Sequence, residues 1–166
     1  MNYRKLFVPI IVFSLAISSL TPLFSNKAMA ASLTALSDTQ TTIKAATASN
    51  HDITFTTPTG VTSGQTIVLT WDNSTSVNAS LDYTDIDVLD DGVDVTLAGT
   101  PSGATWGAVR TSGTVITLTN GTTPVAAASV VRIKIGTNAT NQSTGVRQIT
   151  NGSAGTSTLT IAGGTL

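Results

Sequence analysis

The 166-residue chain is poor in charge, with eight Lys and Arg against nine Asp and Glu, and it contains no cysteine. Its basic residues form no run and no stripe interleaved with aromatic side chains, which argues against a nucleic-acid-binding surface. The absence of cysteine, together with a single histidine, excludes a disulfide framework and a zinc site built from nitrogen and sulfur ligands.

The first thirty residues have the pattern of a secretory signal peptide. Arg4 and Lys5 precede an apolar run at 6–20, and residues 28–30, Ala-Met-Ala, supply small side chains for cleavage. The run is about 15 residues long, whereas a helix needs roughly 20 to cross a bilayer. We therefore expect a secreted or cell-surface chain that begins near Ala31, with no membrane span after removal of the signal peptide. That chain keeps five basic residues against nine aspartates and is mildly acidic.

The rest of the chain predicts an arm followed by one all-β domain. Residues 31–49 are small and polar, and they predict a flexible N-terminal arm with one short strand or loose turn. Residues 50–166 are rich in threonine and lack glutamate, which favours strands because a branched Cβ suits the pleat and is restricted in a helix. The length suffices for one sandwich held together by packing and hydrogen bonds.

Apolar and polar side chains alternate with a period of two along most of this domain. The pattern is clear in 51–56, where His51, Ile53 and Phe55 share one face, and in a hairpin whose turn is Asp90-Asp91-Gly92. We predict an immunoglobulin-like antiparallel β-sandwich of about eight short strands. The predicted strands are 51–56, 65–71, 85–88, 93–97, 105–110, 114–119 and 131–135, with two further candidates at 146–150 and 156–161. The last candidate has no following partner segment, which predicts an open and incomplete sheet edge.

Six of the nine aspartates lie within residues 82–94, around the predicted hairpin. Calcium binds several oxygen ligands from loop carboxylates, so Asp87, Asp90 and Asp91 are candidate calcium ligands. The spacing is not that of an EF-hand. The alternative is that Asp85, Asp87 and Asp94 form the solvated face of the hairpin, with the other two carboxylates in its turn; this alternative is the better supported.

Aromatic rings with a polar tip can stack on sugars, and Trp106 and Tyr83 are the candidates for such a glycan platform. Core packing is the alternative for Trp106. It is favoured for Trp71, which shares the parity of Ile67 and Leu69.

No catalytic apparatus is visible in the sequence. His51 is the only histidine, no Gly-x-Ser-x-Gly segment occurs, and the aspartates are concentrated in one hairpin. We interpret His51 as a strand-edge residue hydrogen-bonded to backbone, and we predict no enzymatic activity.

The segment 47–69, TASNHDITFTTPTGVTSGQTIVL, together with 83–87, 91–94, 105–107 and 135–140, resembles uncharacterised secreted proteins of small-genome candidate-phyla bacteria. The resemblance implies a cell-surface β-sandwich and supplies no catalytic residues. Members of that group continue past the equivalent of Ile161, which implies that this chain is a partial sequence.

We therefore expect a structural or adhesive cell-surface module, in which the arm at 31–49 adds as a strand to the open edge of a neighbouring subunit. A carbohydrate-binding module and a calcium-stabilised adhesin domain are the alternatives. The expected partners are cell-surface components, glycans or copies of the chain itself. No cofactor is expected unless calcium binds.

Overall fold

A computed structural model of the chain describes residues 32–72, 74–155 and 157–163. The predicted signal peptide lies outside these ranges. The described residues form strands, turns and one short 3-10 helix, η1 (Tyr83–Asp85), so the all-β prediction is confirmed. No helix within them has the length and apolarity to cross a membrane.

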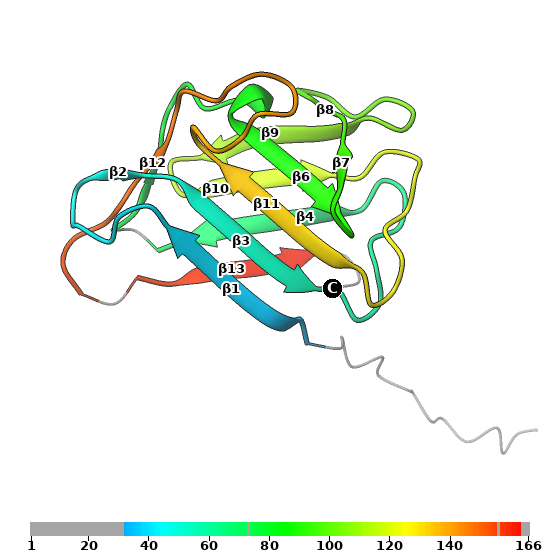
Figure 1. Ribbon diagram of the computed structural model, residues 1–166, viewed down its shortest axis with the longest axis horizontal. Coiled ribbons are helices and arrows are strands. Elements are labelled where there is room, and N and C mark those ends of the chain that lie inside the picture. The colour runs from blue at the N-terminus through cyan, green and yellow to red at the C-terminus, as the bar shows by residue number, and fades with distance from the viewer. Residues whose placement is uncertain (1–31, 73, 156, 164–166) are drawn as a thin grey trace, which may run out of the picture.

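Two five-stranded sheets stack face to face around one core (Figure 1). The first, called the β3 sheet, has the order β1-β3-β11-β6-β7 and is antiparallel throughout. Its strands are β1 (Thr34–Gln40), β3 (His51–Thr56), β11 (Val130–Ile135), β6 (Ile86–Asp90) and β7 (Val93–Val95).

The second, called the β4 sheet, has the order β13-β4-β10-β9-β8. Its strands are β13 (Leu159–Gly163), β4 (Thr66–Trp71), β10 (Val115–Thr119), β9 (Trp106–Ser112) and β8 (Leu97–Ala98). All of its pairs are antiparallel except β8 with β9. A small third sheet at one end of the stack joins β2 (Ala48–Ser49), β12 (Ile149–Thr150) and β5 (Ser76–Val77).

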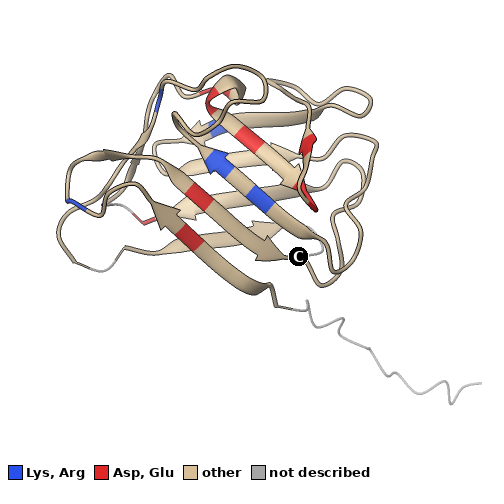
Figure 2. Ribbon diagram, in the orientation of Figure 1, with Lys and Arg blue, Asp and Glu red and all other residues tan. Residues whose placement is uncertain are grey.

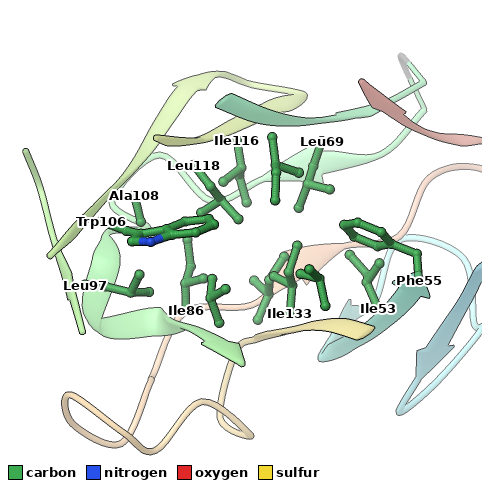
Figure 3. Close-up of a cluster of buried hydrophobic side chains, with 14 of the residues drawn as sticks. Ile53, Phe55, Leu69, Ile86, Leu97, Trp106, Ala108, Ile116, Leu118 and Ile133 are labelled. Atoms are coloured by element: carbon green, nitrogen blue, oxygen red, sulfur yellow. The ribbon is translucent and has the colours of Figure 1, made fainter. Parts of the chain in front are cut away.

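The core is built from the inward rows of these strands, as the alternation predicts. Ile53 and Phe55 of β3 and Ile133 of β11 meet Leu69 of β4 and Ile116 of β10 across the gap between the sheets (Figure 3), and all five are 0% exposed. The predicted inward residues of 51–56, 65–71, 114–119 and 131–135 are all buried, Trp71 among them. Period-two patterning therefore identified most of the core.

The N-terminal segment differs from the flexible arm expected at 31–49. Residues Thr34–Gln40 form β1, which lies along β3 in antiparallel pairing from Gln40 opposite His51 to Thr34 opposite Thr56. The register is interrupted between Thr34 and Ser37. The sequence predicted one short strand or loose turn in this segment. It did not predict the length or the partner of β1, because β1 has no buried side chain and its pairing uses backbone groups that every residue carries.

The predicted hairpin is present, but its second strand is shorter than expected. Val88 lies opposite Val95 in the β6–β7 pair, and the strand then leaves the β3 sheet, because the following Leu97 pairs with Trp106 in the β4 sheet. Val93, which was expected to face inward, is 69% exposed at the end of an edge strand. The chain thus crosses between the two sheets at this corner of the sandwich.

Candidate functional site

A cavity of about 340 Å³ opens at the side of the sandwich where β7 and β8 end the two sheets. We call it the edge cavity. Its lining includes two carboxylates, several valines and one tryptophan, notably Asp90, Val93, Asp94, Val95, Trp106 and Val125. Two residues singled out in the sequence, Asp90 and Trp106, therefore line one cavity.

Asp90 carries an inward-facing carboxylate at the end of β6. It shares the parity of Ile86 and Val88, which are 0% and 1% exposed. Its Oδ1 is buried and accepts no hydrogen bond. Burial raises the pKa of the Asp90 carboxyl, the neighbouring Ser129 hydroxyl opposes this shift, and the charge of Asp91 adds to it.

Asp85 and Asp87 do not form the solvated face expected for the hairpin, because the loop 136–148 covers them. Asp85 is 0% exposed, and its Oδ1 accepts the backbone N–H groups of Val146 at 2.8 Å and Arg147 at 2.9 Å. Asp87 is 1% exposed and accepts the backbone N–H groups of Thr140 at 2.6 Å and Asn141 at 3.0 Å. Both carboxylates thus anchor a loop that arrives about fifty residues later in the chain.

The three candidate calcium ligands have separate roles in the structure. Asp87 holds the loop, Asp90 faces the edge cavity, and Asp91 adopts a positive φ of 48° in the turn and accepts the backbone N–H of Val130 at 2.8 Å. In the part of the chain that the structure describes, no group of three or more His, Cys, Asp or Glu side chains could hold a metal ion. Calcium binding stays a prediction, and the arrangement of these carboxylates adds nothing to it.

The two candidate sugar-stacking rings are not displayed as an exposed platform. Trp106 is 1% exposed and packs in the core beside Ala108, Leu97 and Leu118 (Figure 3). Tyr83, on η1, is half-buried against the same core. A ring face that is already covered by core side chains offers little area to a sugar.

A second polar cluster, which sequence reasoning did not find, joins β1 to β3. Nδ1 of His51 lies 2.8 Å from Oδ2 of Asp38, within hydrogen-bond distance. The His51 ring makes an edge contact with Trp71 at 5.7 Å between centroids. Nε2 of His51, Oδ1 of Asp38 and Nε1 of Trp71 are buried without hydrogen-bond partners. The sequence analysis expected the His51 ring to bond to backbone. In the structure its partner is the Asp38 side chain.

The outer face of the β3 sheet carries charges of both signs, because the Arg and Lys of β11 lie beside the Asp of β3 (Figure 2). Arg132 of β11 forms an exposed ion pair with Asp52 of β3, with Nε donating to Oδ1 at 2.8 Å. The Arg132 side chain holds the pKa of the Asp52 carboxyl below its usual value, chiefly by this hydrogen bond. An exposed pair of this kind contributes little to stability, which makes Asp52 a useful control position.

No family model matches the chain, and no curated protein matches it significantly.

Proposed function

We propose that the protein is a secreted structural or adhesive module of the cell surface whose copies associate by exchanging β1. The observation that carries the proposal is the position of β1, a long edge strand that contributes no buried side chain to its own domain. The signal-peptide pattern in the first thirty residues supports export.

The two sides of the sandwich differ in the edges they present. On one side the sheets end in β1, of seven residues, and β13, of five, and Asp38 is the single charged residue on these strands. On the other side they end in β7, of three residues, and β8, of two. Proteins avoid edge pairing with short strands and charged side chains, so the β1/β13 side is the one suited to association.

The attachment of β1 favours exchange over fixed docking. Backbone pairing with β3 holds the strand, and its most buried side-chain contact is the pair between Asp38 and His51. Another copy of the chain offers an identical β3, so exchanging β1 between copies replaces each contact with an equal one. The segment 41–47, which contains the 89% exposed Ile43, would serve as the hinge.

The chain contains no cysteine, so an engineered disulfide can report whether β1 pairs within one chain or between chains. Ser37 of β1 and Thr54 of β3 lie directly opposite each other, within the Cα range of a disulfide. After oxidation, Ser37→Cys with Thr54→Cys should give disulfide-linked dimers and larger species on a non-reducing gel. A linked monomer alone would contradict the proposal.

The matched control is Val68→Cys with Thr117→Cys, which are also opposite each other but join β4 to β10, two strands that are not at an edge of the β4 sheet. We expect this pair to form only within one chain. Dimers in the control would reveal random oxidation between chains. The amount of dimer formed by the Ser37→Cys, Thr54→Cys protein beyond that of the control then measures the exchange of β1.

We further propose that the sandwich is immunoglobulin-like. The support is that successive strands alternate between the two stacked sheets, from β3 to β4, then β6, and later from β10 to β11 and β13. An experimentally determined structure, compared strand by strand with immunoglobulin domains, would test this; a different order of connections would contradict it.

A further inference from the structure

The edge cavity lies on the side of the sandwich opposite β1, where β7 and β8 end the sheets. It therefore takes no part in the proposed exchange of β1. Its volume of about 340 Å³ is at the lower end of the range of small-ligand sites.

The charged residues that line the cavity are all acidic. Asp90 and Asp94 line it, and no Lys, Arg or His is among the lining residues. Asp94 lies opposite Leu89, so its exposed side chain is on the outer face of the sheet. Asp90 belongs to the inward row of β6 and has one oxygen buried without a hydrogen bond. A carboxylate that has lost part of its hydration gains more from a bound cation than a solvated one does.

The remaining walls are apolar. Val93, Val95 and Val125 line the cavity together with the edge of the core at Trp106. Valine side chains provide no ligands for a hard inorganic cation, which takes six to eight oxygens. They do fit the methylene stem of an organic cation.

We propose that the edge cavity binds an alkylammonium group, with the ammonium at Asp90 and the methylene stem against the valines. This chemistry is shared by a free amine and by a lysine side chain on a partner protein. A lysine of a partner protein is flanked by backbone amides, and a free amine is not. Ammonium probes with and without these amides therefore distinguish the two ligands.

The test is a titration of the 15N-labelled protein with n-hexylammonium, with neutral n-hexanol of the same length, and with Nα-acetyl-lysine N-methylamide. We expect both ammonium probes to shift the amide resonances of 90–96 and 123–125, and hexanol to bind at least about tenfold more weakly, as expected for loss of a charged hydrogen bond. Tighter binding of the lysine derivative than of hexylammonium would indicate a partner's lysine, and the reverse order a free amine.

Three variants assign the binding to the cavity. Asp90→Asn should weaken hexylammonium binding by about tenfold or more, and the matched control Asp52→Asn, on the outer face of the β3 sheet, should change it by less than about twofold. Ala104→Leu, which adds bulk to the lining and keeps both carboxylates, should also weaken it. Equal binding of hexanol, an unchanged affinity in Asp90→Asn, or displacement of the amine by millimolar calcium would overturn the proposal.

Discussion

The loop anchored by Asp85 allows a quantitative test of how the domain is held together. Asp85 is fully buried, and besides two backbone N–H groups of the loop it accepts the backbone N–H of Asp82 at 3.2 Å through Oδ2. In Asp85→Asn the amide oxygen can replace only one carboxylate oxygen, and the NH₂ group would then face the Asp82 N–H, donor against donor.

The expected loss is about 2–4 kcal/mol, because charge-assisted hydrogen bonds contribute roughly 1.5–3 kcal/mol each and a buried donor is left unpaired. For a domain of this size each kcal/mol lowers Tm by about 3–5 °C, so Tm should fall by about 6–20 °C. Thermal unfolding followed by circular dichroism measures this, and hydrogen exchange should accelerate at the amides of Val146 and Arg147 in particular.

The matched control is Asp52→Asn, which removes the exposed pair with Arg132 and should cost less than about 1 kcal/mol. If the Tm of Asp85→Asn lies within about 2 °C of that control, the carboxylate does not hold the loop and the assignment is wrong. Gly145→Ala is an independent check on the same loop, since a Cβ there would overlap the carbonyl oxygen of Gly136. It should destabilise the domain by a comparable amount.

Three further predictions concern the edge cavity, β1 and calcium. Asp90 has a raised pKa in the folded state, so its stabilising contribution is present at low pH and is lost as pH rises through that value. Asp90→Asn should therefore raise Tm at pH 7 and leave it unchanged near about pH 3; a lower Tm at pH 7 would contradict this. His51→Ala removes the contact to Asp38 and should increase the disulfide-linked dimer of the Ser37→Cys, Thr54→Cys protein; an unchanged yield would show that the contact does not restrain β1. If calcium stabilises the native domain, a chelator should lower Tm, and a Tm that stays within about 1 °C would reject the calcium prediction.

Prediction from sequence succeeded where the information is local. The alternation of Ile53 and Phe55 with threonines, or of Ile116 and Leu118, identifies a strand and its buried face from a few adjacent residues. The same alternation extends from Ile86 through Val88 to Asp90, so the sequence already indicated that Asp90 faces inward. We did not infer this, because the neighbouring aspartates favoured a solvated hairpin.

Local patterning could not reveal the partners of Asp85 and Asp87. Both lie in a polar stretch that is typical of a solvated hairpin, and only the return of residues 136–148 across the sheet covers them. The loop is recruited by backbone N–H groups, which every residue except proline carries and which therefore leave no mark in the sequence.

By itself, then, the sequence determined the all-β class, most of the core and the signal-peptide pattern, because each depends on side-chain type at a short spacing. Only the tertiary structure decided that β1 pairs with β3, that His51 meets Asp38, and that Asp90 and Trp106 line one cavity at the β7/β8 edge. These arrangements depend on which distant segments the two sheets bring together, and the free energy that selects them belongs to the packed domain as a whole.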